Sequence, residues 1–149
     1  MNAQPTLQDA IALARQAHAG QVDKAGAPYI DHPLRMAASL DNEEARIVAV
    51  LHDVVEDTSV TLDDLRAAGY SAEIIAAVDG LTRREDESYE EFIQRAAANP
   101  LARLVKIADL RDNMNLARIA RPTQKDHQRL ERYRQALQVL GNQVGADEG

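Results

Sequence analysis

Residues 45–57 read ARIVAVLHDVVED, and this stretch decides how the rest of the chain is interpreted. Asn42, just before it, can cap the start of a helix. The apolar residues fall on most sides of that helix, so we expect it to lie at the centre of the fold. His52 and Asp53 lie inside the apolar run, where an unpaired carboxylate would cost several kcal/mol. Some compensating partner for Asp53 is therefore predicted.

Helix signals continue on both sides of this stretch. Capping residues or a first-turn proline predict further helix starts near Thr6, Pro33, Thr61, Ser71, Ser88, Asn99 and Thr123. The last helix is predicted to stop at Gly141, with residues 142–149 as a frayed tail. We expect an all-α bundle of about seven or eight helices, a single domain over residues 1–149 with its core at about 6–140.

The composition supports helices and excludes several classes of protein. The chain has 26 alanines, one phenylalanine and no tryptophan, a core composition that favours close-packed helices over strands. It has no cysteine, which excludes disulfides, cysteine-ligated metals and a thiol nucleophile. The net charge of −7 argues against DNA or RNA binding through a basic surface.

The cellular location of the protein is predicted from its apolar runs and its first residues. No apolar run approaches the roughly 20 residues of a membrane span, so no membrane association is expected. The first residues, 1–5, lack the basic and apolar parts of a signal peptide. The protein is predicted to be cytoplasmic, and the sequence leaves its oligomeric state open.

Asp53 needs a compensating charge, either from a salt bridge or from a bound cation. Three more acids follow, Glu56, Asp57 and Asp63, and no lysine or arginine lies among them. Glu56 comes three residues after Asp53, on nearly the same face of a regular helix. This local excess of negative charge favours a metal.

Further ligands are available at a distance in the sequence. His32 ends a long loop over residues 20–32, and Asp109 lies in an apolar helical stripe. With His52 and Asp53 they offer two imidazoles and two carboxylates. This set suits Mn²⁺, Fe²⁺ or Zn²⁺ and leaves a position for water. No local sequence pattern indicates that residues 32 and 109 lie near residue 52.

Four motifs, in order, resemble the HD-domain metal-dependent phosphohydrolases. They are AHAGQ at 17–21, GAPYIDHP at 26–33, LHDVVEDT at 51–58 and VKIAD at 105–109. The likeness spans about residues 6–120. The chain looks like the hydrolase domain of Rel/Spo-type alarmone enzymes, and especially like their stand-alone small hydrolases.

The resemblance implies both a ligand set and a reaction. His32, His52, Asp53 and Asp109 correspond to Mn²⁺ ligands, and the catalytic residues Glu56 and Asp57 to the pair that activates and positions water. That family removes the 3′-diphosphate from guanosine tetra- or pentaphosphate, which makes a small nucleotide the expected partner.

Four residues are predicted to contact the substrate. Lys24 and Lys106 offer positive charge to phosphate, although Lys106 has an ion pair with a nearby acid as an equal alternative. Tyr29 either stacks on a base or packs in the core. Asn113 matches a position of the family pattern.

The sequence departs from the family pattern where the nucleotide would be recognised. Asp23 stands where an arginine is usual, and Asn115-Leu116 replaces a common Arg-Thr. A carboxylate there would repel phosphate. Hydrolysis of another nucleotide phosphate is therefore an alternative, as is a metal-binding sensor or interaction module without turnover.

The remaining polar features have plainer interpretations. His18 is predicted to support the core or the site rather than bind metal, and His127 to lie at the surface. Residues 82–87 are interpreted as a solvated connection, which could instead supply Arg83 or Arg84 to the rim of a ligand pocket.

Overall fold

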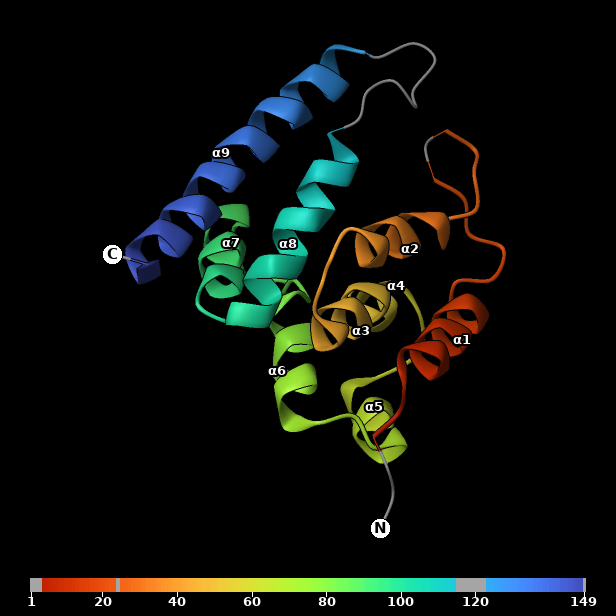
Figure 1. The fold of residues 1–149 in the computed structure, drawn as a ribbon. Coiled ribbons are helices and arrows are strands. Elements are labelled where there is room, and N and C mark those ends of the chain that lie inside the picture. Colours follow the sequence, from red (N-terminus) through yellow and green to blue (C-terminus); the bar gives the residue numbers. More distant parts are fainter. Residues whose placement is uncertain (1–3, 24, 115–122, 149) are drawn as a thin grey trace.

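The computed structural model describes residues 4–23, 25–114 and 123–148 (Figure 1). Within these residues the chain forms nine helices, and apart from them an isolated β-bridge joins Val22 and Pro28. The helices are α1 Leu7–Ala17, α2 Asp31–Ala38, α3 Glu43–Leu51, α4 Val54–Asp57, α5 Leu62–Ala68, α6 Ala72–Gly80, α7 Tyr89–Ala97, α8 Pro100–Asn113 and α9 Gln124–Glu148. The predicted all-α bundle is confirmed, with α4 as a single turn between longer helices.

The helix starts follow the capping residues identified in the sequence. Thr6, Thr61 and Ser88 form complete capping boxes with the acid three residues later. Side chains of Asn42, Ser71 and Asn99 each accept one backbone N–H of the following turn. These bonds satisfy donors that the first turn of a helix otherwise leaves free.

Helix α3 lies at the centre of the main core, as predicted. It packs against α1 and α2 on one side and against α6 and α8 on the other (Figure 1). Its residues Ile47, Val48, Val50 and Leu51 are essentially inaccessible to solvent. The helix that carries His52 at its end is thus the most enclosed part of the chain.

A second, smaller core joins α7, α8 and α9. Phe92 and Ile93 of α7 pack there with Leu110 of α8 and with Ala136 and Leu140 of α9. Because α8 contributes to both cores, it links the central helix to the C-terminal part of the bundle.

The predicted end of the last helix at Gly141 is wrong. Helix α9 continues to Glu148, through residues expected to form a frayed tail. Glycine stops a helix by adopting positive φ, and the described glycines that do so are Gly20, Gly26 and Gly69. Although α9 has 25 residues, neither it nor any other described helix is long and apolar enough to cross a membrane.

Candidate active site

The central helix is interrupted at His52 and Asp53. The sequence predicted an unbroken helix here, and this was wrong: α3 ends at Leu51 and α4 begins at Val54. In a regular helix the carbonyl of Ala49 would accept a hydrogen bond from the N–H of Asp53. Instead it accepts from His52, whose ring Nδ1 lies 2.6 Å and whose backbone nitrogen lies 3.5 Å from that oxygen.

Three of the four predicted ligands meet in one buried cluster. We call His32, His52 and Asp109 the buried ligand group, because they are only 6%, 3% and 6% exposed and offer ligand atoms within 4.8 Å of one another. Nε2 of His32 lies 2.9 Å and Nε2 of His52 lies 3.8 Å from Oδ1 of Asp109. Residues distant in sequence are therefore brought together by the packing of α2, α3 and α8.

The histidines in this group present Nε2 to its centre. Nδ1 of His52 donates to the Ala49 carbonyl, and Nδ1 of His32 donates to Asp112 at 2.6 Å. In a neutral ring Nε2 then carries the lone pair. Among the described residues Nε2 of His52 is buried without a hydrogen-bond partner, although Oδ2 of Asp53 is 3.1 Å away. A ring nitrogen buried beside carboxylates can give up its proton and bind a metal ion.

Other residues hold the buried ligand group in place. Arg35 donates two hydrogen bonds to Asp112, at 2.9 and 3.0 Å, and Asp112 in turn binds His32. Such a carboxylate behind a ligating histidine orients the ring. Asp112 was not among the predicted site residues, although it lies three residues after Asp109 and so on the same helix face.

Charge in this cluster favours a cation. Burial lowers the pKa of His52, but the carboxylates of Asp53 and Asp109 outweigh it and raise that pKa to about 9. Burial alone would raise the pKa of Asp109, yet Lys106 and the two histidines hold it well below its usual range. The field that keeps a proton on the imidazoles equally favours a divalent metal.

Beside this cluster lies a second one, Asp53, Glu56 and Asp57, which we call the open carboxylate group. Its ligand atoms also lie within 4.8 Å of one another, but Asp53 is half-buried, and Glu56 and Asp57 are exposed. Partial burial and the negative charges of Asp53 and Glu56 raise the pKa of Asp57. Asp53 also lies beside His52 of the buried ligand group, so it adjoins both clusters.

The predicted substrate contacts that the structure describes are bonded to carboxylates of the site. The Tyr29 hydroxyl donates to Asp53, Lys106 donates to Asp109 at 2.8 Å, and Asn113 donates to Asp109 at 2.9 Å. The ion pair of Lys106 is one of its two predicted alternatives. Lys24, like Asn115 and Leu116, lies outside the described residues.

The remaining polar residues are placed as follows. His18 is buried, with its ring 4.8 Å from that of Tyr29 and its Nδ1 2.9 Å from Oε1 of Gln21, which fits the predicted supporting role. His127 is exposed, as predicted. Asp63 lies apart from the acidic clusters, with an 89% exposed side chain paired to Arg66.

Asp23 has a structural role in the loop before α2. Its Oδ1 accepts hydrogen bonds from the N–H groups of Ala25 at 2.9 Å and Ala27 at 3.0 Å. These bonds close the turn between the bridged residues Val22 and Pro28. An arginine at this position could not accept them, because guanidinium has no acceptor.

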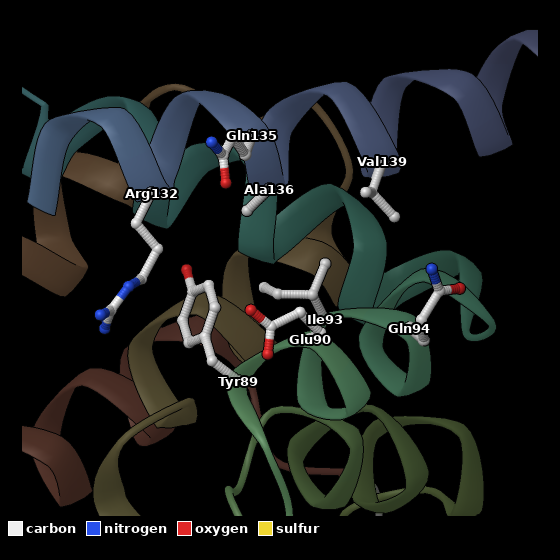
Figure 2. Close-up of a pocket in the computed structure, with 8 residues that line it drawn as sticks. All are labelled: Tyr89, Glu90, Ile93, Gln94, Arg132, Gln135, Ala136 and Val139. Atoms are coloured by element: carbon white, nitrogen blue, oxygen red, sulfur yellow. The ribbon is translucent and has the colours of Figure 1, made fainter.

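A pocket of about 200 Å³ lies between α7 and α9 (Figure 2). Figure 2 shows the Tyr89 ring and the Arg132 side chain at one end and Val139 towards the other. The guanidinium of Arg132 lies 5.4 Å from the Tyr89 ring centroid. None of the sequence-predicted site residues lines this pocket, so it is separate from the acidic clusters.

Most of the chain matches a known protein family. The family described as "HD domain" matches residues 10–140. The chain belongs to the HD-domain family. This membership, together with the buried His/Asp cluster, implies dependence on a divalent metal.

The relatives of this HD domain include alarmone enzymes. It is 32% identical to a probable GTP pyrophosphokinase of Mycobacterium leprae, covering 93% of this chain and 19% of that protein. It is 32% identical to a guanosine-3′,5′-bis(diphosphate) 3′-pyrophosphohydrolase of Aquifex aeolicus, covering 72% and 17% respectively. The bifunctional (p)ppGpp synthase/hydrolase SpoT of Escherichia coli K12 is 31% identical over 80% of this chain. The chain spans about a fifth of the length of these curated relatives.

One solved structure shows the same fold. It is described as a metazoan ortholog of SpoT that hydrolyzes ppGpp, and it superposes with a TM-score of 0.75 at 24% identity. The match covers 97% of this chain and 89% of that chain.

Proposed function

We propose that this HD domain is a metal-dependent phosphohydrolase that acts on a phosphorylated nucleotide, with guanosine tetraphosphate as its substrate. The observation that carries the proposal is Nε2 of His52, a ring nitrogen buried without a hydrogen-bond partner among the described residues and adjoining the open carboxylate group. Relatives named as 3′-pyrophosphohydrolases support the choice of substrate.

The proposed metal is Mn²⁺, held by His32, His52, Asp53 and Asp109. Fe²⁺ or Zn²⁺ would accept the same donors. When bound, the cation would neutralise phosphate charge and make water more acidic. Arg35 and Asp112 would keep His32 oriented, and Lys106 and Asn113 would keep Asp109 oriented.

The open carboxylate group is proposed to handle the proton. Glu56 accepts a proton from the attacking water, and Asp57 positions that water. The water oxygen bonds to the phosphorus attached to ribose O3′, the bond from that phosphorus to O3′ breaks, and O3′ takes up a proton. The products are GDP and pyrophosphate.

Lys24, Tyr29, Lys106 and Asn113 remain proposed substrate contacts. The last three also bind carboxylates of the site, so their substitution would disturb the ligands and the substrate together.

The deciding experiment incubates Mn²⁺-loaded protein with guanosine tetraphosphate and uses Asp53→Asn as the blank. We expect release of GDP and pyrophosphate by the wild type alone. Metal content is measured on the same samples. No release from wild type that contains metal would overturn guanosine tetraphosphate as the substrate.

Asp23 favours one alternative, hydrolysis of another nucleotide phosphate. Its carboxylate closes the loop at the position where the resemblance to the alarmone hydrolases implies an arginine. The same assay on other 3′- and 5′-phosphorylated nucleotides tests this, and turnover of one of them without turnover of guanosine tetraphosphate would support it. A sensor without turnover would hydrolyse none of them while still binding metal.

A further inference from the structure

We propose that Arg95 is a positioning residue for Glu56 and acts through the peptide group between Thr82 and Arg83. The proposal rests on the proposed function, because it assigns Arg95 to the residue that takes the proton. Residues 82–87 would then be part of the active site's support rather than a solvated connection.

The Glu56 carboxylate is held by a backbone N–H group. Glu56 lies on the single-turn helix α4, and its carboxylate is exposed. Its Oε1 accepts a hydrogen bond from the backbone N–H of Arg83 at 2.7 Å. Among the described residues, this is the hydrogen bond that orients the Glu56 carboxylate.

The same peptide group is bound on its other side. The carbonyl of Thr82 accepts a hydrogen bond from Nη2 of Arg95 at 2.7 Å. The Thr82 carbonyl and the Arg83 N–H belong to one planar unit, so fixing one fixes the other. A charged donor at the carbonyl also polarises the peptide and strengthens the N–H as a donor.

Arg95 is itself held firmly. Its Nη1 donates to the carbonyl of Asp79 at 2.9 Å, and its Nε and Nη2 bind the two oxygens of Glu87 at 2.7 and 2.9 Å. The side chains of Arg95 and Glu87 are only 22% and 9% exposed. The guanidinium therefore ties the end of α6 and the start of α7 to the peptide that holds Glu56. We call this set of bonds the Arg95 clamp.

A general base loses much of its effect when its carboxylate is displaced by an ångström or so. The Arg95 clamp supplies the fixed point that an exposed side chain on a one-turn helix lacks. It also leaves Oε2 of Glu56 available to water.

The test substitutes Arg95→Lys, which keeps the charge but cannot reach three acceptors at once. We expect kcat on guanosine tetraphosphate to fall about 10- to 100-fold, with KM and metal content near those of the wild type. The matched control is Arg46→Lys, because Arg46 is also half-buried and donates to a backbone carbonyl, that of Leu40 at 2.6 Å, away from Glu56. Its kcat should stay near wild type.

A second readout does not depend on activity. In ¹⁵N-labelled protein, hydrogen exchange at the Arg83 amide should become at least about 10-fold faster in Glu56→Ala and in Arg95→Lys, and stay unchanged in Arg46→Lys. If Arg95→Lys does not fold, Glu87→Gln loosens the same guanidinium and takes its place.

The outcomes separate the two proposals. Unchanged hydrogen exchange at the Arg83 amide in a folded Arg95→Lys variant overturns the Arg95 clamp. If the wild type hydrolyses guanosine tetraphosphate, an unchanged kcat of Arg95→Lys overturns it as well. If the wild type hydrolyses no guanosine tetraphosphate, the proposed substrate fails, and Arg83 exchange still decides whether Arg95 holds Glu56.

Discussion

The buried ligand group and the open carboxylate group lie side by side but differ in burial and in the number of side chains that bind them. The buried ligand group is enclosed, and partners such as Asp112 and Lys106 bind its rings and carboxylate. The open carboxylate group lies on the single-turn helix α4 and on Asp53 directly before it, and two of its three residues are exposed. Asp53 adjoins both groups.

Under the proposed function, this difference would separate metal binding from proton transfer. Ligands for a metal need fixed charges sheltered from water, where electrostatic interactions are strong. Residues that move a proton from water to a leaving group must meet both water and substrate. Substitutions in the buried ligand group should therefore affect stability and metal binding, and substitutions in the open carboxylate group should affect rate.

The largest effect is expected from Asp109→Asn. It leaves the buried charge of Lys106 without its carboxylate, which should destabilise the fold by about 3–5 kcal/mol in urea unfolding. Metal content should also fall sharply. The control is Asp63→Asn, since Asp63 is exposed and paired with Arg66, and its effect should stay within about 0.5 kcal/mol. Equal stability of the two variants would contradict the stabilising role of the buried Asp109 carboxylate.

Glu56→Gln should show the reverse pattern. We expect kcat to fall about 10²- to 10⁴-fold, because the amide cannot accept the proton. The urea midpoint and metal content should match the wild type, because Glu56 is exposed and is not a proposed ligand. A variant that retains full turnover would remove Glu56 from the reaction.

Asp112→Asn should weaken the metal site without removing a ligand. The amide is a poorer acceptor for Nδ1 of His32 and a weaker partner for Arg35. Metal affinity, measured by competition with a chelator, should fall about 10- to 100-fold. Unchanged affinity would mean that the orientation of His32 does not depend on Asp112.

The smallest effect is expected from Glu87→Gln and depends on pH. Hydrogen bonds from Arg95 lower the pKa of Glu87 to about 2 in the folded chain, against an ordinary value of 4.5. The carboxylate therefore stabilises the fold fully above about pH 4.5, and this contribution is lost as the pH falls towards 2. The variant should be at most about 1 kcal/mol less stable at pH 7. In urea unfolding, the difference in free energy of unfolding between wild type and Glu87→Gln should become smaller from pH 7 down to pH 2.5. A difference that grows on acidification would contradict the prediction.

Much of the fold was predictable because its signals are local. A capping side chain such as Thr6 bonds to a backbone group three residues away, whatever the rest of the chain does. The apolar run at residues 45–57 likewise requires burial on most sides. The break at His52 was missed because a ring bonding to the Ala49 carbonyl competes with the helix, and periodicity does not register that choice.

The candidate ligands were predictable in type and in order along the chain, through the motif spacing and the family resemblance. The neighbours that hold them were not. His32 and Asp112 are 80 residues apart, and Arg83 and Glu56 are 27 apart. No local pattern pairs such residues.

By itself, the sequence determined an α-helical bundle, an acidic segment without a neutralising base, and a set of candidate metal ligands. Only the tertiary structure decided which acids are buried with histidines and which stay open to water, and that Arg95 ties the segment beside Glu56. The physical reason is that a charged contact depends on the burial and orientation of both partners. For these residues, both are set by how α2, α3, α4, α7 and α8 pack together.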